Sequence, residues 1–124
     1  MRFLLAAVWA WCLASAWGET LFASHYSGQV YTLQLQNTTA GYDLSISSQI
    51  TGCGGLPSWL TYEPATKALY CSDETMFGQG SISSFSAGAN GALTSTGKAP
   101  APAGGVANVL YGGSDGRSFI AIAH

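Results

Sequence analysis

Residues 57–74 of this chain read PSWLTYEPATKALYCSDE. The stretch holds two apolar runs, at residues 59–62 and 68–71, separated by a turn that contains Pro64. Proline fixes its own φ and lacks an N–H donor, so it suits a turn better than a strand interior. The stretch therefore predicts a β-hairpin with almost no charge inside its strands. Because a two-stranded hairpin this apolar is unstable alone in water, it must pack against neighbouring strands.

The hairpin has copies on both sides of it. Its second half, residues 69–74, aligns with residues 21–26 and with residues 119–124. A glycine-led strand follows the first two copies, at residues 28–33 and 80–85. A period near 50 residues with about four short strands is typical of a β-propeller blade. An all-β chain rich in glycine and serine can also align with itself by chance, but strand order, turn position and alternation recur together here, which favours the propeller.

The rest of the chain is predicted to be short strands joined by turns, an all-β fold. No window after residue 18 shows helical periodicity. Two segments rich in glycine or proline, residues 51–56 and 98–105, are expected to be loops that cross between blades, and Trp59 is expected in the core between blades. The expected strands are 20–26, 29–35, 42–50, 59–62, 68–71, 81–85, 93–97, 107–111 and 118–123.

Counted in blades, these strands give three of one blade, four of the next and two of a third. A propeller closes into a ring so that no blade keeps an open edge, and repeat folds need several neighbours. We therefore expect the chain to be the N-terminal part of a longer protein that supplies downstream blades, or the product of a truncated gene.

The N-terminus has the pattern of a secretory signal peptide. Arg2 gives a positive start, and residues 3–14 form an apolar run shorter than a membrane span needs. Small residues allow cleavage after Ala16 or after Gly18, of which Gly18 is preferred; an uncleaved signal anchor is the alternative. We expect residues 1–18 to be removed, and residues 19–124 to form a secreted, extracellular domain without a membrane segment.

The mature chain carries few charges. Six acidic and three basic residues follow residue 18, with no basic patch, so nucleic acid is not an expected partner. The two histidines and two cysteines after residue 18 lack zinc-ligand spacing, and the glycine-rich segments complete no nucleotide-binding motif, so we expect neither a metal nor a cofactor. Residues 112–116, GGSDG, formally match the G-x-S-x-G nucleophile motif. A strand is predicted after them where that motif needs a helix, which indicates a hairpin turn.

Two covalent features are predicted. Cys12 lies in the signal peptide, which leaves Cys53 and Cys71 as an even pair. In an oxidising secretory route they are expected to form a disulfide between the loop before the central hairpin and its second strand, with two free buried thiols as the alternative. Asn37 begins the triplet Asn-Thr-Thr in a turn between strands, so it is a candidate glycosylation site, although such triplets also arise by chance.

A longer motif extends over the second blade. It begins with Pro-Ser-Trp-Leu, continues through a turn to Leu-Tyr and then reaches an acidic residue. The sequence Gly-Ser-Ile-Ser-Ser-Phe follows at residues 80–85. This pattern resembles the lactonase family of seven-bladed propellers, which includes 6-phosphogluconolactonase-like proteins and carboxy-cis,cis-muconate lactonising enzymes. The resemblance covers essentially everything after the signal peptide and implies a small-molecule lactone or carbohydrate as partner. The matching residues of the first motif are Pro57, Ser58, Trp59, Leu60, Leu69, Tyr70 and Glu74.

The resemblance assigns no catalytic residue to this chain. The family's catalytic His, Arg and Glu fall mostly in later blades, and Asn108 stands where the family commonly carries a His in the third blade. The resemblance implies a protein that hydrolyses or forms a sugar or muconate lactone, inactive as this piece alone, and the signal-peptide pattern adds that it is secreted. The alternative is a noncatalytic extracellular propeller that binds carbohydrate or protein.

Pocket-lining candidates come from the repeat itself. In a propeller, the loop after the second strand of each blade lies at one mouth of the central channel. The repeat puts Tyr26, Glu74 and His124 at equivalent exits, with His25 and Asp73 beside them. A His and a carboxylate that face one cavity can serve as general base and acid on a lactone carbonyl. The alternative is that all five are solvated loop residues.

Overall fold

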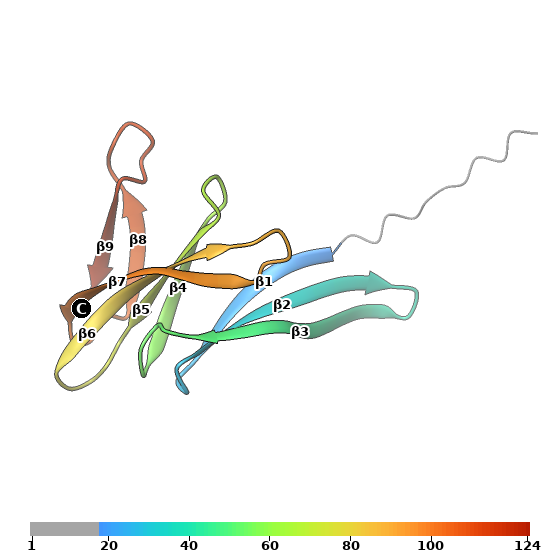
Figure 1. Ribbon diagram of the computed structural model, residues 1–124, viewed down its shortest axis with the longest axis horizontal. Helices are drawn as coiled ribbons and strands as arrows, with labels where there is room; N and C mark the ends of the chain where they lie inside the picture. Colours follow the sequence, from blue (N-terminus) through green and yellow to red (C-terminus); the bar gives the residue numbers. More distant parts are fainter. Residues whose placement is uncertain (1–17) are drawn as a thin grey trace, which may run out of the picture.

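The computed structural model describes residues 18–124, which form three antiparallel sheets and no helix (Figure 1). The predicted cleavage region and the apolar run before it lie outside the described residues, apart from Gly18. The sheet orders are β1-β2-β3, β4-β5-β6-β7 and β8-β9. The strands are β1 (Gly18–His25), β2 (Gln29–Thr38), β3 (Gly41–Thr51), β4 (Pro57–Glu63), β5 (Ala68–Asp73), β6 (Gln79–Ala87), β7 (Leu93–Pro102), β8 (Ala107–Tyr111) and β9 (Phe119–Ala123).

The three sheets are successive propeller blades, here called the first, second and third blade. The predicted count of three, four and two strands is confirmed. The order β1-β2-β3 repeats the order β5-β6-β7, and the pair β8-β9 repeats the pair β4-β5. Strands β1, β5 and β9 therefore occupy equivalent places, as the sequence repeat predicts. Strand β4 contacts β1 on the first blade and β8 on the third. No helix within residues 18–124 is long and apolar enough to cross a membrane.

Strand β7 departs from the sequence-based prediction. Residues 98–105 were expected to form a crossing loop, but β7 runs on to Pro102, where it pairs with Gln79 of β6. That prediction is wrong because β7 is the outer strand of its sheet. An edge strand tolerates proline, since the missing N–H can face away from its single partner.

Trp59 also departs from its prediction. Its side chain is 47% exposed, so it is not part of the core between blades. The neighbouring Leu60 packs against the buried cluster instead. Successive residues of a strand point to opposite faces, which places Trp59 on the other side of β4.

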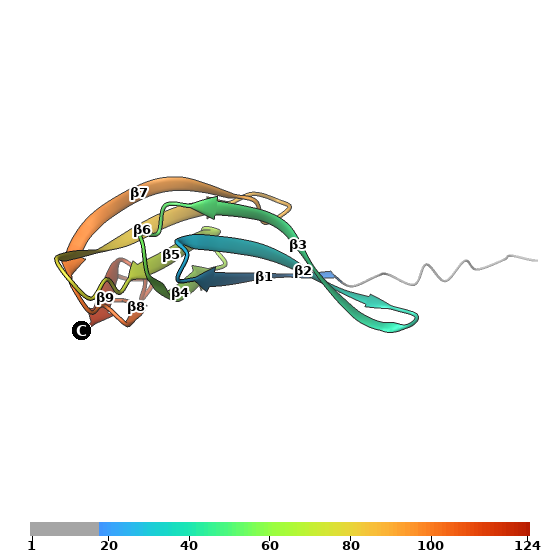
Figure 2. The same cartoon turned by 90° about the horizontal axis from the view of Figure 1, so that it is seen from below.

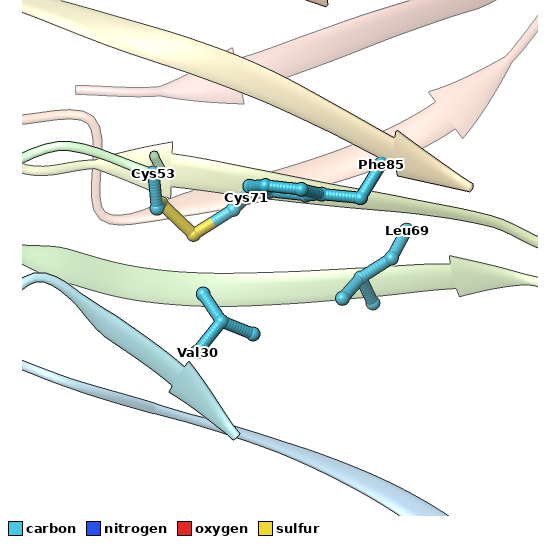
Figure 3. Packing of buried hydrophobic residues seen from close by; sticks show 5 residues of the cluster. All are labelled: Val30, Cys53, Leu69, Cys71 and Phe85. Atoms are coloured by element: carbon cyan, nitrogen blue, oxygen red, sulfur yellow. A yellow bond between two sulfur atoms is a disulfide. The ribbon is translucent and has the colours of Figure 1, made fainter. Parts of the chain in front are cut away.

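The core lies between the first and second blades. Val30 of β2 packs against Leu69, Cys71 and Phe85, which come from β5 and β6 (Figure 3). Each of these four side chains is at most 1% exposed. The half-buried Phe22, Ile50, Leu60 and Leu93 surround the cluster.

A disulfide joins this core to the loop between the blades. Cys53, in the loop between β3 and β4, is bonded to Cys71 of β5, with Cα atoms 5.7 Å apart (Figure 3). Both residues are fully buried. The bridge therefore fixes the chain segment that leaves the first blade onto the inner face of the second.

Polar contacts reinforce the packed interface between the first and second blades, which we call the seam. Ser83 Oγ of β6 donates a 2.8 Å hydrogen bond to the carbonyl of Gly52. The buried Thr32 Oγ1 of β2 donates a 2.9 Å bond to the carbonyl of Gly91, in the turn between β6 and β7. Gly91 has φ of +78°, and a Cβ there would lie 2.8 Å from the Thr32 methyl group. Only glycine suits both the backbone conformation and the close approach.

The third blade is attached to the second by hydrogen bonds and one ion pair. Thr61 Oγ1 of β4 donates to the carbonyl of Asn108 at 3.1 Å, and Asn108 Nδ2 donates to Ser72 Oγ at 2.8 Å. Arg117, in the turn between β8 and β9, lies 3.3 Å from the carboxylate of Glu63. Hydrogen bonds from the hydroxyl and N–H of Thr66 lower the pKa of Glu63, although burial opposes them.

We predict that the double variant C53S/C71S loses about 3 kcal/mol of unfolding free energy, the value expected for a closed loop of this length. The measurement is denaturant unfolding of oxidised wild type, reduced wild type and the variant. Reduced wild type should match the variant. Two thiols alkylated in unreduced protein after denaturation would contradict the prediction.

The substitution Phe85→Ala is expected to cost about 3–5 kcal/mol, because it empties the centre of the seam between the blades. Phe77→Ala is the matched control, since its ring is 91% exposed and its loss should cost less than about 0.5 kcal/mol. Both values come from the same unfolding measurement. Equal costs for the two variants would show that Phe85 does not belong to a packed core.

Candidate functional site

The candidate residues gather at one edge of the sheets, where β1, β5 and β9 end. We call this edge the rim and define it as residues 25–27, 74–78, 103–105 and 124. The loops of all three blades meet here: Gly104 N donates a 2.6 Å hydrogen bond to the carbonyl of Glu74. The carbonyl of Ala103 lies 3.2 Å from Nδ1 of His124.

Tyr26 and Glu74 form the closest pair at the rim. The Tyr26 hydroxyl donates a 2.9 Å hydrogen bond to Oε2 of Glu74, which joins the first blade to the second. This bond, with the negative charge of Glu74, raises the pKa of Tyr26 above its ordinary value of 10.0. Glu74 is half-buried and Tyr26 is exposed. The sequence repeat thus identified two residues, 48 positions apart, that touch.

The two histidines are both exposed but differ in which ring nitrogen is free to accept a hydrogen bond. His25 Nδ1 accepts a 3.1 Å hydrogen bond from the N–H of Ser27, so a neutral ring carries its proton on Nε2. His124 Nδ1 faces the carbonyl oxygen of Ala103 and must carry the proton to bond it. A neutral His124 therefore presents Nε2 as an acceptor, the state that a general base requires.

Asp73 is held inside the structure, unlike the other four candidates. Its side chain is 7% exposed. Oδ1 accepts a 3.0 Å hydrogen bond from Leu56 N, and Oδ2 accepts one from Ser81 Oγ at 3.3 Å. A Cβ on Gly54 would overlap this carboxylate, so the crossing loop fits closely around it. Asp73 thus anchors the loop between β3 and β4 beneath the rim.

Sequence reasoning missed two apolar residues at the rim. Met76 and Phe77, in the loop after Glu74, are 70% and 91% exposed. The available signal was an apolar pair inside a loop that interrupts strand alternation. Both side chains therefore lie open to solvent in the loop that follows Glu74.

Two other sequence features have a structural role. Residues 112–116 form the turn between β8 and β9, and no helix follows, so the formal nucleophile motif is a hairpin turn as predicted. Asn108 is 6% exposed, and its Oδ1 has no hydrogen-bond partner. Residues 18–124 contain no group of three or more His, Cys, Asp or Glu side chains placed to hold a metal ion.

The three sheets repeat one strand order, and equivalent strands of each end at the rim. This arrangement is that of a β-propeller. The model of the lactonase, 7-bladed beta-propeller family matches residues 20–124. The chain therefore belongs to this family. No curated protein and no solved structure matched it.

We predict that Glu74→Gln lowers the pKa of Tyr26 toward 10, because the substitution removes the charge and the carboxylate acceptor that favour the protonated phenol. Since the pKa of Tyr26 is raised by folding, the stability gained from this contact is complete below pH 10 and is lost as the pH rises through the folded-state pKa. Ultraviolet titration of each protein, with the Tyr26→Phe curve subtracted, isolates this phenol. Glu19→Gln is the control and should leave the titration unchanged. An identical Tyr26 titration in Glu74→Gln would show that the pair does not form.

Proposed function

We propose that these blades belong to a secreted lactonase-like propeller that hydrolyses, or in reverse forms, a sugar or muconate lactone. The observation that carries the proposal is the family match over residues 20–124. The rim supports it, since the Tyr26 phenol contacts the Glu74 carboxylate there. The His124 imidazole contacts the loop whose Gly104 N–H bonds the Glu74 carbonyl. Export is supported by the positive start and apolar run before residue 15.

The rim residues suit lactone opening through acid–base chemistry. A water oxygen bonds to the lactone carbonyl carbon, and the ring C–O bond breaks. Glu74 or Nε2 of His124 takes the proton that the water loses, and the ring oxygen gains a proton to become the product hydroxyl. Tyr26 holds the Glu74 carboxylate in place through its 2.9 Å hydrogen bond. The products are a carboxylate and a hydroxyl, with no oxidant, reductant or metal required.

The test is lactone hydrolysis by the native protein, with acid release followed in a pH-stat. Sugar δ-lactones with and without a phosphate, and a muconolactone, are the substrates. We expect turnover above the spontaneous rate and a loss of about 100-fold or more in kcat/KM for Glu74→Gln, the usual range for a proton-transfer group. Glu19→Gln should retain full activity. Hydrolysis at only the spontaneous rate by correctly folded native protein would overturn the enzymatic proposal.

A noncatalytic carbohydrate-binding propeller is the second candidate. It is favoured by the exposed rings of Tyr26 and Phe77 at the rim and by Asn108 in place of the family's common His. Aromatic faces provide large apolar contact areas for binding. In the same experiment this candidate gives saturable sugar binding without turnover, and Phe77→Ala weakens that binding.

A further inference from the structure

The far end of the first blade carries an exposed hairpin tip. Strands β2 and β3 continue past the seam and end in the turn between Thr38 and Gly41. Figures 1 and 2 both show this tip projecting away from the sheets of the second and third blades. The hydroxyl of Thr38 donates a 2.9 Å hydrogen bond to the carbonyl of Gly41, which closes the turn.

Asn37 lies in β2, not in the turn expected from the sequence, and is the direct partner of Tyr42 in β3. Residues directly opposite each other on antiparallel strands project from the same face, with Cβ atoms about 4.5–5.5 Å apart. Asn37 is exposed, and the Tyr42 ring is 78% exposed. Both line a surface hollow of about 400 Å³ together with Leu35 and Glu19.

We infer that Asn37 carries an N-linked glycan whose first sugar packs on the ring of Tyr42. Three observations meet at this place: the triplet Asn-Thr-Thr, the exposed side chain of Asn37, and an open aromatic ring directly across from it. A sugar linked to the Asn37 amide extends over the hollow, where its C–H face covers Tyr42 and its hydroxyls remain in water. The hairpin tip is therefore shielded by carbohydrate. This inference rests on the export proposed above, because glycan transfer requires the secretory route.

The first experiment measures occupancy on the native protein. Enzymatic removal of the glycan converts a glycosylated asparagine to aspartate, so peptide mass spectrometry after removal should find Asp at position 37. No other asparagine of the chain begins such a triplet, which makes the assignment unique. Unmodified Asn37 before enzyme treatment overturns the inference. The N-terminus and the location of the protein then separate the causes: a start after Ala16 or Gly18, or an uncleaved protein held in the membrane, assigns the failure to the site, whereas residues 1–18 retained on cytosolic protein assign it to export. Lactone hydrolysis is unaffected by either result.

The second experiment tests the contact with Tyr42 by thermal unfolding. Trimming the glycan to its first sugar should leave the Tm of wild type unchanged, and complete removal should lower it by a few degrees. Tyr42→Ser should show no such loss, while Tyr42→Phe keeps the ring and should behave as wild type. Tyr111→Ser removes a tyrosine from the other exposed hairpin and is the matched control. Equal Tm losses in wild type and Tyr42→Ser would overturn the proposed contact.

Discussion

The seam between the first two blades is the packing on which the rest of the structure depends. Val30 on one side meets Leu69, Cys71 and Phe85 on the other, and the Cys53–Cys71 disulfide fastens the crossing loop into the same layer. Few side chains of the described residues are completely buried, so the stability of the fold depends on each of them. The disulfide adds to the packing by limiting the conformations of the unfolded chain around the seam.

The seam also positions the rim. Asp73, at the end of β5, accepts a hydrogen bond from Leu56 N of the crossing loop and another from Ser81 Oγ of β6. The next residue, Glu74, then emerges toward solvent and meets Tyr26 of the first blade. Two adjacent carboxylates thus have different roles because one points into the seam and the other out of it. The acid–base chemistry proposed for Glu74 depends on Asp73 keeping its structural place.

Much of the fold could be predicted from the sequence because propeller blades repeat. The alignment of residues 21–26, 69–74 and 119–124 predicted that β1, β5 and β9 are equivalent. It placed Tyr26 and Glu74 at equivalent strand ends, and the structure adds that their side chains are in contact. The end of β7 was not predictable from its prolines alone, because their tolerance depends on an edge position that only the sheet order reveals. The exposure of Trp59 and the burial of Asp73 likewise depend on which face of each strand meets a neighbouring blade.

Amide hydrogen exchange of the native protein, resolved by peptide, tests the seam most directly. We predict that the slowest exchange lies in β5 and β6, around Leu69, Cys71 and Phe85, and that the tip of the β2–β3 hairpin exchanges fastest among the paired strands. Reduction of the disulfide should raise exchange first in residues 52–56 and β5. Fast exchange in β5 in the oxidised protein, or no change there on reduction, would contradict the central role of the seam.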